Sequence, residues 1–446
     1  MAQARFSHDM AALKTIAADA LAHAAQNGAS ACDAEASDGY GQTVTVRKGE
    51  VETIEYNRDK SLGVTVYVGK RKGYASTADF TGRAIRDTVD AALTIARFTA
   101  EDEAAGLPDP EDLARDPGDL DLFHPWDLPV ERAIGIAKAC EAAAFRLDKR
   151  VVNSEGASVS CQQWHFALAD SHGFLHGFPT SRHTISCAVI AAEDGRMQRD
   201  DWYVSKRSPR DLADPESVGD YTGRRALARL GSRKIGTVQA PVLFEAPVAN
   251  DLLATFVSAV SGGNLYRKAS FLLDSLGKEV FAPMVTLIER PHLPRAAASS
   301  WYDDEGVATR DRDVVKDGVL RGYFLGSYSA RKLGMKTTGS AGGNHNLILQ
   351  GGDLDLPGLT RKMGRGLLVT ELIGFGVNLV TGDYSRGAAG YWVEGGEIRY
   401  PVEEITIAGN LRDMFRSVAA IGADTLTRGS RTCGSILIDG MTIAGN

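Results

Sequence analysis

Apolar residues in the first hundred positions follow first a helical and then a strand spacing. Residues 1–28 predict an amphipathic helix that ends at Gly28. Two alternating runs on either side of Lys48-Gly49-Glu50 predict a hairpin. A strand is predicted next, with its apolar face at Leu62, Val64, Val66 and Val68. A helix follows, with apolar residues at helical spacing at Ile85, Val89, Ala92 and Ala96.

The middle of the chain begins with a segment that favours neither a long helix nor a central strand. Residues 101–128 are acidic and rich in proline, so we expect an extended connection. Pro129 predicts the start of a helix that runs to about Lys149. Strands are then expected in the runs 157–171, 173–195 and 197–207, and another helix at 215–230, closed by Gly231.

The second half opens with a short apolar strand at 242–244 and a helix over 247–261. Pro247 suits a first helical position, and Gly262 with Gly263 suits a stop. The buried stripe of this helix is predicted at Val248, Leu252, Leu253, Phe256, Val257 and Val260. Two later stretches, 313–334 and 390–422, share the order strand, turn, strand, then helix or loop, which suggests an internal repeat.

Strands and helices come in clusters along the chain and do not alternate strictly. This order favours an α+β fold with antiparallel sheets over a doubly wound parallel sheet. A chain of 446 residues is also too long for one ordinary core. We therefore expect an N-terminal α+β domain at 1–237, with subregions 1–100 and 129–237 joined by the acidic connection, and a sheet-rich C-terminal domain at 238–446.

Composition and charge narrow the class of partner. Hydrophobic residues make up 43% and charged residues 24% of the chain, as in ordinary globular proteins. The formal net charge of −7 argues against nucleic acid or an anionic membrane as the main partner. No signal peptide or long apolar span is expected. A reducing cytoplasm is indicated by five scattered cysteines without a CxxC pair: Cys32, Cys140, Cys161, Cys187 and Cys433.

Common catalytic motifs are absent from the sequence. There is no GxxxxGK[ST] phosphate loop, no GxSxG nucleophile elbow and no HExxH zinc helix. The GFG at 374–376 lacks the third glycine of a dinucleotide fingerprint, so a turn is the better interpretation.

Four histidines, His165, His172, His176 and His183, gather in the predicted strand region. His172 and His176 differ by an even number, so one strand would point both side chains to the same face. Zinc needs three or four ligands, and no acid or cysteine here has an obvious ligand or supporting role. Ordinary strand and turn histidines are the better interpretation.

Asp303, Asp304 and Glu305 form the densest polar cluster beside aromatic residues. Three successive carboxylates could bind a divalent cation or act as acid and base. Such a run before a glycine is more often a solvated turn.

Cys433 lies between arginines and a glycine. Arg428 and Arg431 could lower the pKa of its thiol and make it reactive. A lone cysteine without a paired histidine is usually not a nucleophile.

The chain resembles the TldD/PmbA family, and most closely its PmbA (TldE) branch. The resemblance lies in YDDEGVATRDRDVVKDGVLRGYFLGSYSARKLG, in KTTGSAGGNHNLIL, in NLVTGDYSRGAAGYWVEGGEIRYPVEEITIAGNL and in the N-terminal SLGVTVYVGKRKGYASTADF. It implies two α+β parts, the C-terminal one larger and sheet-rich. It also implies a pair of related subunits that form a metallopeptidase acting on peptides or unfolded chains.

The resemblance also gives a meaning to the helix at 247–261, which has no acid, base or soft ligand from Phe256 to Leu265. In the catalytic TldD branch, the matching helix carries His-Glu-Ala-Val-Gly-His, and a later cysteine before a glycine completes the zinc site. With residues 259–260 on the Ala-Val of that motif, Val257 and Gly262 stand in place of the two histidines, Ser258 stands in place of the glutamate, and Cys433 matches the cysteine. We expect no catalytic residue, metal site or cofactor in this chain, with zinc in the partner subunit.

A non-catalytic subunit is therefore predicted. Its expected partners are a TldD-like catalytic subunit in a heterodimer, a second copy when the chain is alone, and peptide or unfolded protein substrate. The glycine-rich turns around Gly339–Gly343 and Gly387–Gly390 are candidate walls of a peptide chamber. Two alternatives remain, namely a binding protein that modulates a target such as DNA gyrase, and a stand-alone peptidase that uses Asp303, Asp304, Glu305 or Cys433.

Overall fold

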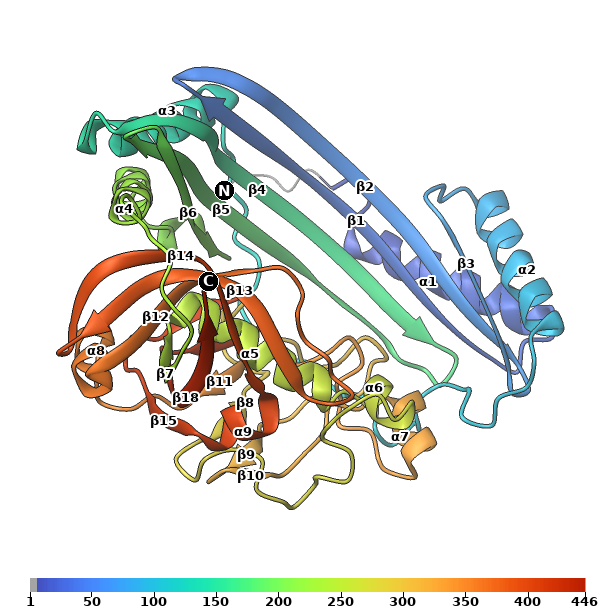
Figure 1. Cartoon of the computed structure of the whole chain (residues 1–446). Coiled ribbons are helices and arrows are strands. Elements are labelled where there is room, and N and C mark those ends of the chain that lie inside the picture. Colours follow the sequence, from blue (N-terminus) through green and yellow to red (C-terminus); the bar gives the residue numbers. More distant parts are fainter. Residues whose placement is uncertain (1–5, 446) are drawn as a thin grey trace. The chain divides into compact units, whose positions relative to one another are not determined.

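The computed structural model describes residues 6–445, and the chain divides into two compact units (Figure 1). Unit 1 runs to Leu227 and includes two short later segments, Pro294–Ala296 and Trp301–Ala308. Unit 2 contains Ala228–Leu293, Ala297–Ser300 and the chain from Thr309 onward. Both units combine helices with mainly antiparallel sheets, which confirms the predicted α+β class.

Unit 1 is built on one antiparallel sheet with the strand order β3-β2-β1-β4-β5-β6. Its strands are β1 (Ala31–Arg47), β2 (Glu50–Val68), β3 (Arg71–Thr77), β4 (Val151–Asp170), β5 (Leu175–Glu193) and β6 (Arg196–Lys206). Its helices are α1 (Met10–Gln26), α2 (Gly82–Phe98), α3 (Val130–Leu147) and α4 (Pro215–Ala228), with a 3-10 turn at Pro209–Asp211. The four helices lie where the apolar spacing predicts them.

The β1–β2 hairpin is longer and simpler than the sequence pattern predicts. Its turn falls at Lys48 and Gly49, whose φ angles of 53° and 76° suit a two-residue hairpin. The buried Glu141 of α3 accepts the N–H groups of Lys48 at 2.8 Å and Gly49 at 2.7 Å. The two separate strands predicted after the turn are one strand of 19 residues, because β1 pairs with it almost from end to end.

One face of this sheet is buried under α1 and α2. Val89 and Leu93 of α2 and Leu13 of α1 share a core with Leu62 and Val64 of β2. Because side chains alternate along a strand, the residues between the buried positions of β1 and β2 face the opposite side of the sheet. That opposite side carries the polar side chains considered below.

The acidic segment 101–128 forms no helix and no named strand, as predicted. It is nevertheless packed and not merely a surface tether, since its apolar residues are buried. Leu113 forms an isolated bridge to Val307, and the N–H of Ala114 donates to the carbonyl of Gly306 at 2.9 Å. The segment thus fixes the 301–308 stretch within unit 1.

Unit 2 contains two sheets of six strands each. The first has the order β10-β9-β8-β11-β17-β16 and consists of β8 (Leu287–Glu289), β9 (Arg312–Lys316), β10 (Val319–Leu320), β11 (Leu347–Leu349), β16 (Leu426–Arg428) and β17 (Arg431–Cys433). The second has the order β14-β13-β12-β7-β18-β15 and consists of β7 (Val238–Phe244), β12 (Arg365–Ile373), β13 (Asp383–Glu394), β14 (Glu397–Asn410), β15 (Val418–Ile421) and β18 (Ile436–Ala444). Two pairs, β7–β12 and β11–β17, are parallel.

The helices of unit 2 are α5 (Ala246–Ala259), α6 (Gly262–Tyr266), α7 (Ser327–Leu333), α8 (Leu356–Met363) and α9 (Leu411–Arg416). Both stretches of the suggested repeat contain a hairpin followed by a helix, namely β9–β10 with α7 and β13–β14 with α9. The two hairpins belong to different sheets. Unit 2 has two sheets against the single sheet of unit 1, but its strands are mostly shorter and it contains less of the chain.

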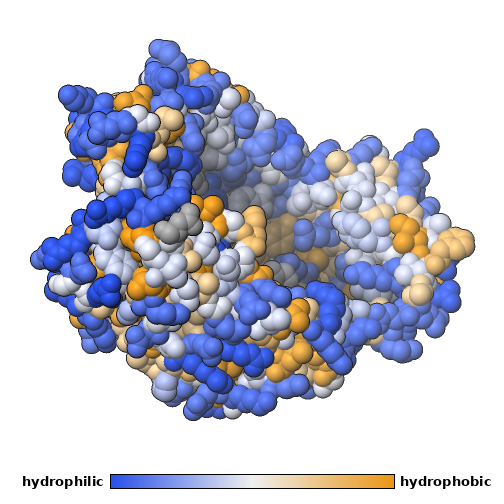
Figure 2. All heavy atoms as spheres, in the orientation of Figure 1, coloured by the Kyte–Doolittle hydropathy of each residue, from blue (hydrophilic) through white to orange (hydrophobic). Residues whose placement is uncertain are grey.

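Within residues 6–445, no helix is both long and apolar enough to cross a bilayer. The face of the molecule in Figure 2 is mostly hydrophilic, with apolar residues scattered in small groups.

Candidate functional site

The α5 helix is a buried element of the unit 2 core. Glu245 precedes it, Pro247 lies in its first turn as predicted, and Leu252, Leu253 and Phe256 are buried on its inner face. The helix ends at Ala259, two residues before the predicted end. A separate short helix, α6, then begins at Gly262.

The positions matched to the first histidine and the glutamate serve the packing of α5. Val257 is half-buried and packs against the core of unit 2. The Ser258 hydroxyl donates to the carbonyl of Ala254 at 3.0 Å, and the Ser258 carbonyl accepts the Asn264 amide at 2.7 Å. Neither side chain supplies a metal ligand or a base.

Gly262, matched to the second histidine, has no room for a side chain. It is buried, and a Cβ added there would lie 2.2 Å from Oγ and 2.5 Å from Cβ of Ser329 on α7. Its N–H also donates to the carbonyl of Phe324 at 2.8 Å. Because the chain leaves α5 before reaching Gly262, Val257 and Gly262 do not lie on one continuous helix.

Cys433 lies far from the other three matched positions. Its Sγ is 3.7 Å from the carbonyl oxygen of Ala246, in the first turn of α5. Val257 follows Ala246 by 11 residues. At about 1.5 Å per residue, this places Val257 roughly 16 Å further along the helix axis. The structure therefore does not bring the four matched positions together.

The two arginines do not lower the pKa of the Cys433 thiol below its ordinary value. Burial, followed by the nearby Asp424 carboxylate, raises the pKa of the Cys433 thiol to about 12, and Arg431 offsets only part of this. The side chain is fully buried. The thiol is therefore protonated at neutral pH and is not a nucleophile.

A zinc ion needs three or four ligands of the His, Cys or carboxylate type. Among residues 6–445, no group of three such side chains is placed to hold a metal ion. From Phe256 to Leu265, which includes the position matched to the glutamate, the chain has no carboxylate or histidine that could act as a general base. The side chains present do not fit the zinc centre of the catalytic branch.

His172 and His176 do not share a strand, so the even spacing does not place them on one face. β4 ends at Asp170 and β5 begins at Leu175, so His172 lies in the turn between them. Its Nδ1 is 3.1 Å from the carbonyl of Pro108. His176 lies beside the ring of Tyr302, and desolvation lowers the pKa of its imidazole.

His165 and His183 are buried structural residues. His165 stacks on Phe6 with ring centroids 3.8 Å apart, and Nε2 of His183 is 2.8 Å from the carbonyl of His124. Burial lowers the pKa of both imidazoles. The four histidines thus act separately, as ordinary strand and turn residues.

Asp303 holds a turn together. Its side chain is buried, and its Oδ1 accepts the N–H groups of Glu305 at 2.9 Å and Val307 at 3.0 Å. Gly306 in the same turn has a φ of 82°, which suits glycine. The turn interpretation holds for this stretch, although Asp303 itself is buried instead of solvated.

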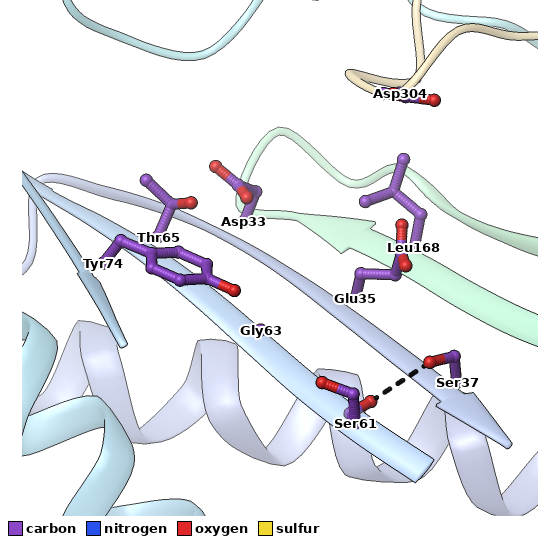
Figure 3. Close-up of a pocket in the computed structure, with 9 residues that line it drawn as sticks. All are labelled: Asp33, Glu35, Ser37, Ser61, Gly63, Thr65, Tyr74, Leu168 and Asp304. Atoms are coloured by element: carbon purple, nitrogen blue, oxygen red, sulfur yellow. Dashed lines mark hydrogen bonds between the residues drawn. The ribbon is translucent and has the colours of Figure 1, made fainter. Parts of the chain in front are cut away.

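A polar pocket of about 230 Å³ lies in unit 1 on the side of the sheet opposite α1 and α2 (Figure 3). Asp33 and Glu35 project into it from β1, and Asp304 faces them from the 301–308 segment. The remaining lining residues are Ser37, Ser61, Gly63, Thr65, Tyr74 and Leu168. Sequence reasoning missed this pocket, although the alternation in DAEAS could have indicated a polar strand face.

The carboxylates of this pocket influence one another. Burial raises the pKa of Asp33 to about 7, with Glu305 and Asp170 adding to the effect and the Thr65 hydroxyl opposing it. Desolvation and then the Asp304 carboxylate raise the pKa of Glu35. The pocket can therefore hold a proton near neutral pH.

The two glycine-rich candidate walls differ in structure. Gly339, Gly342 and Gly343 lie in a loop between α7 and β11 and have positive φ angles, as a turn requires. The stretch from Gly387 to Gly390 is not a turn, because it lies inside strand β13. A Cβ on Gly390 would lie 1.9 Å from the carbonyl oxygen of Leu368, so this glycine permits close approach of β12.

Three domain patterns match the chain in order. The PmbA/TldA metallopeptidase domain 1 matches residues 32–96, the central domain 123–230 and the C-terminal domain 237–445. Together these three matches assign the chain to a class of metallopeptidase-related proteins. The protein belongs to the PmbA/TldD metallopeptidase family, as the sequence resemblance predicts.

Relatives from both branches of the family resemble the chain. Metalloprotease PmbA of Escherichia coli O157:H7 is 50% identical over 405 residues, which are 91% of this chain and 90% of the relative. The Metalloprotease PmbA homolog of Haemophilus influenzae is 45% identical over 91% of this chain and 90% of its own length. The Metalloprotease TldD homolog of the same organism is 22% identical over 86% of this chain and 84% of its own length.

Solved structures share the fold. A Bacteroides thetaiotaomicron protein, named for a proposed role as a modulator of DNA gyrase, aligns with a TM-score of 0.92 and 27% identity over 97% of this chain and 99% of its own. TldE from Thermococcus kodakarensis aligns with a TM-score of 0.82 and 18% identity over 96% of this chain and all of its own. At that identity, the second likeness concerns the fold alone.

Proposed function

We propose that this chain is the PmbA/TldE-type, non-catalytic subunit of a two-subunit zinc metallopeptidase that acts on peptides or unfolded chains. The observation that carries the proposal is the packing of α5 and α6. Position 257 holds a valine against the core, and position 262 has no space for a ligand side chain. A metallopeptidase fold without these ligands has lost its own zinc chemistry.

The proposed partner is a TldD-like chain that carries the intact His-Glu-x-x-x-His helix. Haemophilus influenzae has both a PmbA homolog, at 45% identity to this chain, and a TldD homolog, at 22%. Two branches in one organism are expected when each supplies a different subunit. Related subunits can also reuse one two-fold contact, so the proposed state of the isolated chain is a homodimer.

The proposed contribution of this chain is surface. An extended peptide can bind along a sheet edge through main-chain hydrogen bonds, which are largely blind to side-chain identity. Such binding suits a peptidase for unstructured substrates. The loop containing Gly339 to Gly343 is retained as a candidate wall of the peptide chamber, whereas the β13 glycines are explained by close strand packing.

A reducing compartment, the cytoplasm, is part of the proposal. All five cysteines are free and buried. A disulfide framework, usual for small secreted domains, is not used here.

Two alternatives predict different behaviour of the isolated chain. A stand-alone peptidase would cleave an unfolded peptide without a partner, but Asp303 holds a turn and the Cys433 thiol is protonated. A modulator of DNA gyrase, suggested by the names of structural relatives, would bind that enzyme and need no peptidase partner.

The test compares this chain alone, a TldD-like chain alone and an equimolar mixture, with an unstructured fluorescent peptide as substrate. Cleavage should require the TldD-like chain and increase in the mixture, while this chain alone should be inactive. Zinc analysis after mild dialysis should show no stoichiometric zinc in the isolated chain. Cleavage by the isolated chain, or one tightly bound zinc per chain, would refute the proposal.

A further inference from the structure

Strand β2 has a long edge without a strand beside it. β1 pairs with one side of β2 from Glu50 to Tyr67, whereas β3 pairs with the other side only over Leu62–Val68. In the described part of the chain, no strand pairs with that second side from Glu50 to Ser61, and all twelve residues there are exposed. Figure 1 shows β2 as the outer strand, with β3 only near its C-terminal end.

This edge, Glu50–Ser61, has the properties of a docking surface for another strand. An unpaired edge presents a row of backbone N–H and C=O groups that can pair with a second chain. Proteins usually shorten, cover or interrupt such edges. The Glu50–Ser61 edge contains no proline, and its one register shift lies close to the hairpin turn.

Charge is divided along the edge. The acidic half carries Glu50, Glu52 and Glu55, and the basic half carries Arg58 and Lys60 beside the single acid Asp59. Between the halves lie the exposed Ile54 and Tyr56, with relative exposures of 42% and 68%. When two copies run antiparallel about a two-fold axis at Glu55, Glu50 lies across from Lys60 and Glu52 across from Arg58, and these pairs of opposite charge outnumber the single like-charge pair of Glu55 with its own copy.

We propose that the Glu50–Ser61 edge of β2 docks the same edge of a second copy of this chain, joining the two unit 1 sheets across a two-fold axis near Glu55. This deepens the proposed function, on which it rests, by giving the homodimer a surface. An antiparallel ladder of this length supplies about twelve main-chain hydrogen bonds, within the usual number for a specific interface. Ile54 of each copy then lies beside Tyr56 of the other.

Glu52, Arg58 and Lys60 already have partners within their own chain, which docking of a second copy would have to exchange. Glu52 is 3.3 Å from Arg47, Nη1 of Arg58 is 3.4 Å from the Ser7 hydroxyl, and Lys60 lies 5.1 Å from the centre of the Phe80 ring. The participating β2 side chains are all exposed. Ion pairs in such exposed positions contribute little to stability, so exchange for partners on a second copy is feasible.

The test uses two charge-reversal variants of the full chain in sedimentation velocity experiments. R58E/K60E makes the whole edge acidic, and E50K/E52K makes the acidic half basic. The wild-type chain should be dimeric at micromolar concentration. Each variant alone should dissociate at least tenfold more readily, and an equimolar mixture of the two should recover a heterodimer because opposite charges meet again.

The matched control is R132E/K138E, which makes the same charge change on the exposed face of α3 and should leave the dimer intact. Unchanged circular dichroism spectra establish that the edge variants are folded. A monomeric wild type, variants that dimerise like wild type, or a mixture that stays monomeric would each overturn the proposal. Peptidase activity with a TldD-like chain is measured separately, so its absence in the presence of a normal homodimer would refute the proposed function and leave this edge standing.

Discussion

Gly262→Ala tests whether position 262 has room for any side chain. The added Cβ would lie 2.2 Å from Oγ of Ser329 and 3.0 Å from Cδ2 of Leu325. Gly262 is tied to Phe324 by a 2.8 Å backbone hydrogen bond, and the Ser329 hydroxyl donates to the Gly326 carbonyl at 3.0 Å. Neither α6 nor α7 can therefore move aside without losing a contact.

The magnitude follows from the cost of overpacking a filled interior, which is about 1–3 kcal/mol per substitution. Gly262 does not have a positive φ, so alanine adds no backbone strain and the loss is steric. For a domain of 150–250 residues, each kcal/mol lowers Tm by about 2–4 °C. Unit 2 should then melt roughly 2–12 °C below wild type.

Differential scanning calorimetry of the variant and a neighbouring control provides the assay. Gly263→Ala is the control, because the nearest atom to its added Cβ is the flexible end of Arg267 at 3.1 Å, and it should change stability by less than about 0.5 kcal/mol. Adding Ser329→Gly to Gly262→Ala should recover part of the loss. If Gly262→Ala melts like wild type, position 262 has room for a side chain and the packing argument fails.

Three further predictions concern residues elsewhere in the two units. Val257→Asp should destabilise unit 2 by about 1–3 kcal/mol because its carboxylate would lie against the core, whereas Val257→Ala should cost about 1 kcal/mol. If the urea unfolding curves of both variants coincide with that of wild type, the Val257 side chain is not packed. Cys433 should resist thiol reagents at pH 8 in the native protein, because burial raises its pKa to about 12; rapid native labelling located by peptide mass would contradict this. Asp33 has a folded-state pKa raised to about 7, so its contribution to stability is present below pH 4 and is lost as the pH rises through 7. Asp33→Asn should therefore raise Tm more at pH 8 than at pH 5, and an equal change at both pH values would refute the raised pKa of Asp33.

Helices α1 to α5 could be predicted from the sequence because their apolar residues recur at helical spacing. The sequence pattern does not predict the short helices α6 and α8, and α6 begins at the glycines that are expected to end a helix. Pro247, the buried stripe and the following glycines locate α5 to within two residues of its end. The length of β2 could not be predicted, because its charged first half has no apolar alternation and is held as strand by pairing with β1. The sequence places Gly390 in a turn. Its position inside a strand could not be predicted, because the close contact with Leu368 depends on strands β12 and β13 being adjacent.

The candidate site depended more on tertiary structure than the helices did. The absence of ligands on α5 is visible in the sequence, but the lack of space at Gly262 comes from Ser329 on a distant helix. The position of Cys433 beside Ala246 likewise follows from strand β17 packing against the first turn of α5. Asp33 and Glu35 are two residues apart, yet Asp304, which completes their pocket, comes from a segment far along the chain.

The central claim, that this chain assists catalysis without performing it, is tested most directly by one mixture. The wild-type chain is combined with a TldD-like partner whose motif glutamate has been replaced by glutamine, and cleavage of an unstructured peptide is measured. The account predicts no cleavage above that of the inactivated partner alone, although the heterodimer should form as in the active mixture. Residual cleavage that depends on this chain would show that it contains a catalytic centre of its own.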